Sequence, residues 1–304
     1  MVDLRLDIPE DFYKEEERSD YRVSADMKKV WAVELDMLAE LMRVCRKYDI
    51  TVFADSGTLL GAVRHKGFIP WDDDIDVSIS RSDFEKLNEI APKEFKKPYF
   101  YQTNETDPGS MRGHAQLRRS DTTAILEGEI SSPKINQGIF LDIFPLDNIP
   151  DDEAEAEKFL AELNTLKQKD MRIRRIVNLK KHASGIKGLI LDLLGYIFRF
   201  FRISEKTNKY YEEFEVLRKK YNSENTTRIG NLFRTPVPKR NIYKKEWFNE
   251  KDHMQFEMLD ITVPGKYMDY LNTIYGDWKK YEVGTTAHQG VFFDADNSYK
   301  KYLS

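Results

Sequence analysis

Residues 71–79 have the sequence WDDDIDVSI, which joins a run of acids to an alternating β-strand pattern. Side chains in a strand point alternately to opposite faces. In the predicted strand 74–79, Asp74 and Asp76 therefore share one face, while the Ile and Val residues between them point into the core. Two carboxylates about 7 Å apart on one face repel each other, and a hard divalent cation relieves that repulsion. This stretch predicts a strand that carries a metal site.

A second strand, predicted over 138–144, supplies a third carboxylate. Its apolar residues Ile139, Leu141 and Ile143 alternate with residues of the opposite face, which include Asp142. If the two strands are neighbours, Asp142 comes to lie beside Asp74 and Asp76.

A glycine turn lies between the predicted strand 50–54 and a helix that follows it. Its residues are Asp55, Ser56, Gly57 and Thr58. Backbone N–H groups at the start of a helix bind anions. A glycine turn that can bind phosphate, beside three carboxylates, is typical of metal-assisted phosphoryl transfer. In that reaction a carboxylate can take the proton of the attacking hydroxyl.

Other motifs with acids or glycines fit the sequence less well. An EF-hand loop that begins at Asp72 would have Val77 in place of its glycine and Asp83 in place of its final Glu. A Walker A motif fails because Phe68 stands where Lys is required. A solvated acidic loop and the Asp-x-Asp pair of a sugar-nucleotide glycosyltransferase remain alternatives.

Composition narrows the class of protein. The 304 residues correspond to about two domains. With 48 basic and 52 acidic residues the net charge is −4, which argues against a nucleic-acid-coating protein. A single cysteine, Cys45, excludes a disulfide framework and a cysteine-rich zinc module. No signal peptide is recognisable at the N-terminus, so we expect a cytoplasmic protein with no nucleic-acid partner.

The predicted organisation is α+β. We expect an arm over 1–22, a catalytic core over 23–150 and a mostly helical portion over 151–304 that completes the cleft. Helices are predicted over 151–180, 186–203, 205–221 and near 266–275, and strands over 99–103, 114–119, 122–126 and 228–233.

Three basic residues, Arg64, His65 and Lys66, lie between the glycine turn and the acids, and they are candidates to bind a phosphate. Asp55 either binds substrate or caps the helix. Arg118 and Arg119 alternate on a strand, so one should face the cleft and the other solvent. We choose Arg118 because it shares a polar face with Gln116 and Ser120.

The segment 167–202 combines ten basic residues and two acids with an apolar helical stripe. Interspersed charges exclude a spanning helix. The segment is either a core-facing helix with basic flanks or an interfacial helix that contacts anionic lipid at the inner face of the membrane.

Three motifs together resemble the LicD family: DSGTLLGAVR at 55–64, GFIPWDDDIDV at 67–77 and LDIFPLD at 141–147. Fukutin and fukutin-related protein are animal members of this family. The resemblance implies a nucleotidyltransferase-like fold of the DNA polymerase beta type, which is a mixed sheet with flanking helices. It implies that Gly57 and Thr58 hold phosphate, that Asp74 and Asp76 bind Mg²⁺ (or Mn²⁺), and that Asp142 is the third catalytic carboxylate.

The family transfers a phospho-alcohol, often phosphocholine, from a CDP-activated donor to a glycan hydroxyl and releases CMP. We therefore expect a phosphocholine transferase that uses CDP-choline and a saccharide, lipid-linked glycan or teichoic-acid acceptor. CDP-ribitol and CDP-glycerol remain possible donors. An NTP-dependent nucleotidyltransferase, a glycosyltransferase and a non-catalytic glycan-binding protein are alternatives. A choline group needs aromatic neighbours, and the candidates are Trp71, Tyr101, Phe144, Trp247, Tyr275 and Trp278.

Overall fold

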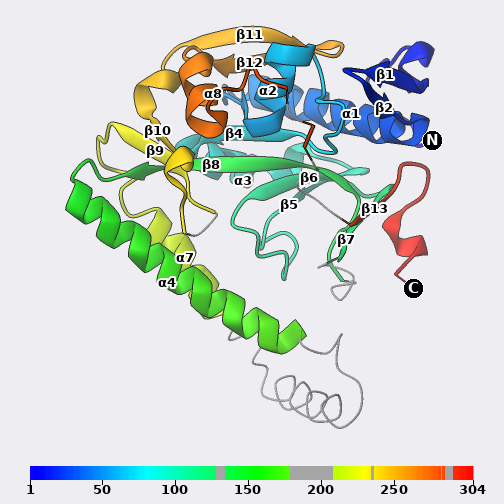
Figure 1. The fold of residues 1–304 in the computed structure, drawn as a ribbon. Helices are drawn as coiled ribbons and strands as arrows, with labels where there is room; N and C mark the ends of the chain where they lie inside the picture. The colour runs from blue at the N-terminus through cyan, green and yellow to red at the C-terminus, as the bar shows by residue number, and fades with distance from the viewer. Residues whose placement is uncertain (128–133, 179–207, 234–235, 282, 285–289, 304) are drawn as a thin grey trace. The chain divides into compact units, whose positions relative to one another are not determined.

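The structure is a computed structural model (Figure 1). It describes residues 1–127, 134–178, 208–233, 236–281, 283–284 and 290–303. The chain divides into two compact units. The first comprises Met1–Leu146 and Tyr243–Ser304, and the second is Asp147–Ile242. The domain boundaries expected at 22 and 150 stay predictions.

The first unit holds most of the described strands. Its helices are α1 (Ala25–Lys47), α2 (Ser56–His65), α3 (Arg81–Glu94) and α8 (Tyr267–Tyr275), with 3-10 turns η1 (Glu10–Tyr13), η5 (Lys245–Phe248) and η6 (Tyr299–Lys301). Its strands are β1 (Glu16–Arg18), β2 (Tyr21–Val23), β3 (Phe53–Ala54), β4 (Asp76–Ser80), β5 (Tyr99–Gln102), β6 (Ala115–Arg119), β7 (Thr123–Leu126), β11 (Lys251–Phe256), β12 (Leu259–Pro264) and β13 (Val291–Asp294). Strands β8 (Ile139–Ile149) and β10 (Ile242–Lys244) belong to both units.

Strand β8 is the centre of a mixed sheet. Strand β4 runs parallel to it, with Asp76 opposite Asp142, and β6 runs antiparallel to it, with Gln116 opposite Asp142. Strands β3 and β5 pair antiparallel with β4 and β6. The predicted α+β class with a mixed sheet is confirmed.

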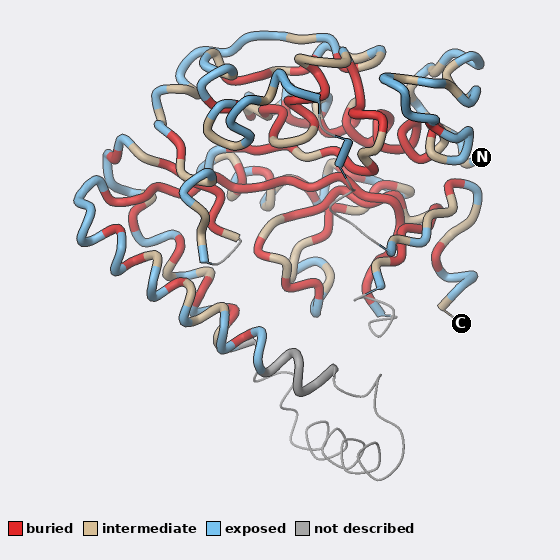
Figure 2. The backbone as a smooth tube through the Cα atoms, in the orientation of Figure 1, coloured by how far each residue is buried: buried red, intermediate tan, exposed pale blue. Residues whose placement is uncertain are grey.

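Strand β8 continues through Pro145, where the sequence predicts that it ends. The N–H of Asp142 donates to the carbonyl of Ile75 on the β4 side (2.9 Å). By alternation the nitrogen of Pro145 faces the other side of β8, beyond the last β6 pair, Ala115 with Ile143. A proline is tolerated there because its missing N–H breaks no bond of that ladder. All of β8 is buried, as Figure 2 shows for the central strands.

Helix α1 begins after its N-cap residue Ser24, whose hydroxyl accepts the N–H of Met27 (3.2 Å). Its buried face includes Trp31, Leu35 and Leu41. Caps of this kind stabilise a helix by about 1 kcal/mol.

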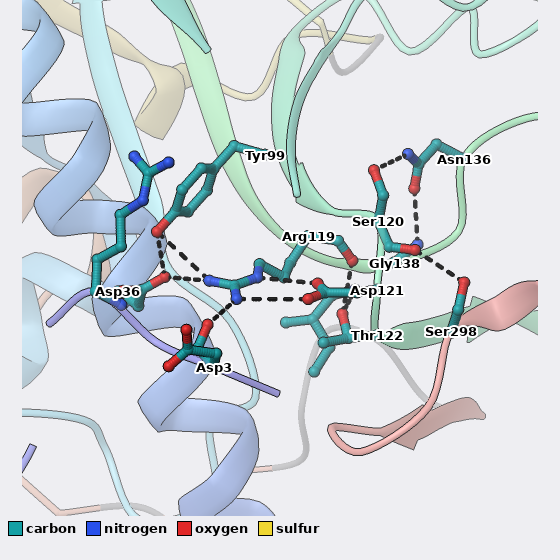
Figure 3. A network of polar contacts seen from close by, with 12 residues as sticks. Asp3, Asp36, Tyr99, Arg119, Ser120, Asp121, Thr122, Asn136, Gly138 and Ser298 are labelled. Carbon is teal, nitrogen blue, oxygen red and sulfur yellow. Dashed lines mark hydrogen bonds and ion pairs between the residues drawn. The ribbon is translucent and has the colours of Figure 1, made fainter. Parts of the chain in front are cut away.

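The alternation of β6 predicts that one of its two arginines faces solvent. Arg119 does not, because helix α1 packs against that face. Arg119 is buried and forms an ion pair with Asp36 of α1 (Figure 3). The hydroxyl of Tyr99 donates to the same carboxylate (2.6 Å), and Asp121 accepts from the guanidinium of Arg119 (2.9 Å). The prediction is wrong because both faces of β6 are covered, so each arginine is buried with polar partners.

The C-terminal part of the first unit contains more strand than predicted. Strands β11 and β12 form an antiparallel hairpin, and β13 pairs antiparallel with β7. The first residues of β11, Lys251, Asp252 and His253, are exposed, so this strand lacks the apolar alternation by which a sequence indicates a half-buried strand.

The second unit contains α4 (Glu153–Asn178), α7 (Asn208–Arg218), β9 (Arg228–Asn231) and the turn η4 (Lys239–Asn241). A buried cluster holds it together, formed by Ile149, Ala156, Phe159, Leu163, Phe214, Tyr221 and Leu232. The helix predicted over 186–203 and most of the basic segment 167–202 lie outside the described residues, so the proposed membrane contact stays a prediction. In the part of the chain that the structure describes, every helix is too short or too polar to span a bilayer.

Candidate active site

The structure brings Asp74, Asp76 and Asp142 together. One carboxylate oxygen from each lies within 4.8 Å of the others. Asp76 begins β4 and stands opposite Asp142 of the parallel neighbour β8. Asp74 lies just before β4 rather than within it, and the alternation continues through Ile75, whose carbonyl accepts from β8.

The electrostatics of this cluster favour a cation. Asp74 and Asp142 are buried, and Asp76 is half-buried. Burial, followed by the charges of Asp76 and Asp72, raises the pKa of Asp74 well above its ordinary value. Burial and the charge of Asp73 do the same to the pKa of Glu34 in α1. Three close carboxylates with such mutual repulsion are a set of oxygen ligands that suits a hard divalent ion.

The predicted glycine turn is the first turn of α2. Asp55 is the N-cap of this helix and accepts the N–H of Ser56 (2.6 Å). Its carboxylate also accepts from the hydroxyl of Tyr270 in α8. Thr58 accepts the N–H of Asp76 through its side-chain oxygen (2.8 Å), so Thr58 links the start of α2 to the start of β4.

Gly57 is needed for the close approach of Asp72. A Cβ atom at residue 57 would lie 2.5 Å from an oxygen of the Asp72 carboxylate. A negative charge is favoured there by the exposed N–H groups of the first helical turn. The absence of a side chain thus lets the acidic loop lie against the start of α2.

We expect Gly61→Ala to destabilise the protein more than Gly57→Ala does. A Cβ at residue 61 would lie 2.4 Å from the carbonyl oxygen of Gly67, which is backbone and cannot rotate away. Overpacking of this kind lowers the free energy of unfolding by about 1–3 kcal/mol. At residue 57 the new Cβ meets only the end of a side chain. Urea unfolding of both variants measures the difference, and a Gly61→Ala protein as stable as Gly57→Ala would contradict the close packing.

The three basic residues between the glycine turn and the acids, at the end of α2, are in different environments. Arg64 donates to the carbonyl oxygens of Trp278 (3.1 Å) and Lys280 (3.4 Å). The ring of His65 lies 5.4 Å from that of Tyr281, and burial lowers the pKa of His65 to about 4. Lys66 is exposed and ends α2 in the left-handed conformation. Arg64 and His65 are therefore both half-buried, whereas Lys66 is exposed to solvent.

Arg118 is fully buried and lies behind Gln116. Its guanidinium donates to the side-chain oxygen of Gln116 (2.6 Å), while the amide nitrogen of Gln116 donates to Asp142 (2.6 Å). Arg118 thus contacts the residue that holds Asp142, and its predicted contact with substrate stays a prediction.

Two neighbours of Asp142 and Asp55, His114 and Tyr270, were not predicted from the sequence. His114 lies 3.3 Å from the Asp142 carboxylate, with its ring against Phe144 (4.7 Å). Tyr270 contacts Asp55 from α8. The polar alternation of the predicted strand 114–119 could have indicated His114, but nothing in the sequence near Tyr270 connects it with residue 55.

Among the six candidate aromatic residues, Tyr101 and Phe144 belong to the core. Tyr101 stacks on Phe95 (5.8 Å). Trp71 is half-buried beside His65 and Tyr21. Tyr275 is 42% exposed, and desolvation, followed by the charges of Asp76 and Asp72, raises the pKa of its hydroxyl. Trp71 and Tyr275 thus keep a surface that a ligand could contact, whereas Tyr101 and Phe144 are buried.

A mixed sheet that presents three clustered carboxylates beside a helix start defines a candidate metal-dependent transferase site. Residues 49–158, which contain all of these features, match the family described as LicD/FKTN/FKRP, nucleotidyltransferase domain. The chain carries a LicD-family domain, and the predicted resemblance is confirmed.

Curated relatives agree with this match. The chain is 27% identical over 248 residues to the lipopolysaccharide cholinephosphotransferase LicD of Haemophilus influenzae. The alignment covers 81% of this chain and 88% of the relative. A shorter match, 38% identical over 79 residues, is to an uncharacterized protein of Rickettsia prowazekii, with 26% of this chain and 29% of that protein covered. The prediction of a LicD-type transferase is confirmed by the family match and by the length of the first of these alignments.

Proposed function

We propose that this protein transfers phosphocholine from CDP-choline to a hydroxyl of a glycan, such as a teichoic-acid or lipid-linked precursor, and releases CMP. The observation that carries the proposal is the convergence of Asp74, Asp76 and Asp142 on two neighbouring strands. The similarity to a lipopolysaccharide cholinephosphotransferase over most of both chains supports the choice of phosphocholine. The nucleotidyltransferase-like topology is part of the same proposal.

The three carboxylates would hold Mg²⁺, and Mn²⁺ would fit the same oxygen ligands. The fit follows from their mutual distance and from the raised pKa of Asp74, which reflects burial and neighbouring carboxylates that destabilise its ionised form, a penalty that a bound cation would offset. The bound ion would supply charge neutralisation for the donor phosphates.

The reaction is a displacement at phosphorus. The acceptor oxygen forms a bond to the phosphorus that carries choline, and the bond from that phosphorus to the bridging oxygen of CMP breaks. The proton of the acceptor hydroxyl passes to a base. Asp142 is the candidate: Gln116 and His114 both approach its Oδ1 atom, so we assign Oδ2 to the cation or the proton.

The remaining site residues would bind the donor. The start of α2, with Asp55, Ser56 and Gly57, would lie against a phosphate, as the resemblance implies. Arg64 would add positive charge. The half-buried ring of Trp71, directly before the acids, would contact the quaternary ammonium group through a cation–π interaction.

The motifs do not fix the alcohol of the donor, so CDP-ribitol and CDP-glycerol remain alternative donors for the same site. Thermal unfolding with Mg²⁺ and each of CDP-choline, CDP-ribitol, CDP-glycerol and CTP separates these donors. A ligand at 100 times its Kd adds about 2.7 kcal/mol to the stability. We expect CDP-choline to give the largest shift and CMP release to accompany it once a glycan acceptor is added.

Two results would contradict the proposal. Protection by CTP with release of pyrophosphate would indicate a nucleotidyltransferase, and turnover of a nucleotide-sugar would indicate a glycosyltransferase. Protection by CDP-ribitol alone would retain the reaction and replace the alcohol.

A further inference from the structure

The carboxylate of Asp142 stands at the end of a series of buried polar side chains. Gln116 donates from its amide nitrogen to Asp142 Oδ1 (2.6 Å). The amide oxygen of Gln116 accepts from Nη2 of Arg118 (2.6 Å). Because a guanidinium only donates, this second bond fixes which end of the Gln116 amide faces Asp142.

Arg118 is held in turn by acceptors on its other side. Its Nε donates to the side-chain oxygen of Gln102 (2.8 Å), and its Nη1 donates to the carbonyl of Gly138 (2.8 Å). The amide nitrogen of Gln102 then donates to Asp107 (2.6 Å) and to the carbonyl of Asn136 (3.0 Å). The orientation of each amide is therefore set by its neighbour in the series.

Burial makes this series stiff. Gln102, Gln116 and Arg118 are each 2% exposed or less. An unpaired buried polar group costs about 1–3 kcal/mol, so turning any one amide around would leave donors facing donors. Gly138 and Asn136 also make further contacts (Figure 3). The side-chain nitrogen of Asn136 donates to the hydroxyl of Ser120, and the side-chain oxygen of Asn136 accepts the N–H of Gly138.

We propose that Gln116, held by Arg118 and Gln102, is a positioning residue that fixes the rotation of the Asp142 carboxylate and thereby sets the affinity of the site for its divalent cation. This inference rests on the proposed metal site and deepens it. A hydrogen bond to Oδ1 fixes the rotation of the carboxylate that contributes one oxygen to the cluster with Asp74 and Asp76, and loss of such a partner of a metal ligand lowers metal affinity about 10- to 100-fold.

The test is a titration with Mn²⁺, with free Mn²⁺ followed by electron paramagnetic resonance, on the full chain without substrate. Gln116→Met keeps the length of the side chain and removes both of its amide contacts. We expect the Mn²⁺ dissociation constant to rise at least tenfold. Gln255→Met is the matched control, because Gln255 is exposed on β11, and it should bind Mn²⁺ like the wild type.

A double-mutant cycle tests the order of the series. Arg118→Met should weaken Mn²⁺ binding in the wild-type background and should have little further effect in the Gln116→Met background, because Arg118 acts through Gln116. If Arg118→Met does not fold, Gln102→Met takes its place in the cycle, and the comparison of Gln116→Met with Gln255→Met stands by itself.

The outcomes separate this inference from the proposed function. A folded Gln116→Met protein that binds Mn²⁺ as tightly as the wild type would overturn the positioning role, and so would a wild-type protein that binds no Mn²⁺. A wild-type protein that binds Mn²⁺ tightly, loses that affinity on Gln116→Met and still turns over none of the CDP-alcohols would support the inference and contradict the proposed function.

Discussion

Replacement of Asp142 by Asn is expected to lower the rate of CMP release about 10³-fold while the protein stays folded. Asn has the shape of Asp and can still accept from Gln116 through its amide oxygen. It removes one negative charge from the set of three carboxylates whose oxygens lie within 4.8 Å of one another. Charge stabilisation by a bound metal is worth several kcal/mol in a transition state, and each 1.36 kcal/mol corresponds to a factor of about ten in rate.

Stability should change in the opposite direction from activity. In the absence of metal, Asp142→Asn relieves repulsion from Asp74 and Asp76, so its melting temperature should equal or exceed that of the wild type. Asp252→Asn is the matched control, since Asp252 is exposed on β11 and should affect neither property. Full activity of Asp142→Asn with CDP-choline would remove Asp142 from the mechanism.

The second large effect is expected in the other unit, at the buried ion pair between Asp147 and Arg218. The Asp147 carboxylate lies 3.2 Å from Nε of Arg218, and the side chains are 0% and 1% exposed. The amide of Asn222 also donates to Asp147 (2.8 Å). Removal of one partner of a buried pair costs about 3–5 kcal/mol, and because Arg218 also pairs with Glu215 (3.0 Å), we expect a loss at the lower end of this range.

Asp147→Ala should therefore lower the free energy of unfolding by about that amount, as measured by urea unfolding. Glu213→Gln is the control on the same helix: Glu213 pairs with Lys209 (3.7 Å) on the exposed surface of α7, where such pairs contribute about 0–1 kcal/mol. The double variant Asp147→Leu/Arg218→Met should recover much of the loss, because both fully buried charges of the pair are removed together. If Asp147→Ala were as mild as Glu213→Gln, the pair would not stabilise this unit.

Asp147 also shows how a sequence motif combines different roles. It lies in the same LDIFPLD motif as Asp142, five residues further along β8. Alternation places the two acids on opposite faces of β8, because five residues separate them, but it does not indicate which group each acid contacts. Only the packing of the second unit shows that Asp147 binds Arg218, whereas Asp142 contacts Gln116.

The cluster of Asp74, Asp76 and Asp142 could be anticipated because strand periodicity is a short-range property. In its own strand, each acid points to the face opposite that of the neighbouring apolar residues. Only one further assumption, that the two strands are neighbours, was needed to predict the cluster. The parallel pairing of β4 with β8 meets that assumption.

The contacts of Arg118 and Tyr270 could not be anticipated in the same way. Arg118 reaches Gln102, sixteen residues away, and Tyr270 reaches Asp55, 215 residues away. Such contacts depend on how β5 and α8 pack, and a charged or aromatic residue in a sequence does not indicate which distant group it contacts. The hairpin β11–β12 was missed because its pairing is made by backbone groups, with little apolar pattern in the first of its strands.

The most direct test of the central claim is the position of a bound cation in a crystal soaked in Mn²⁺, located by its anomalous scattering. We predict an anomalous peak between Asp74, Asp76 and Asp142, with one oxygen of each bound to the ion. This peak should be lost in the Asp76→Ala variant. A well-occupied Mn²⁺ ion bound elsewhere in the protein, with these three carboxylates left without metal, would contradict this prediction.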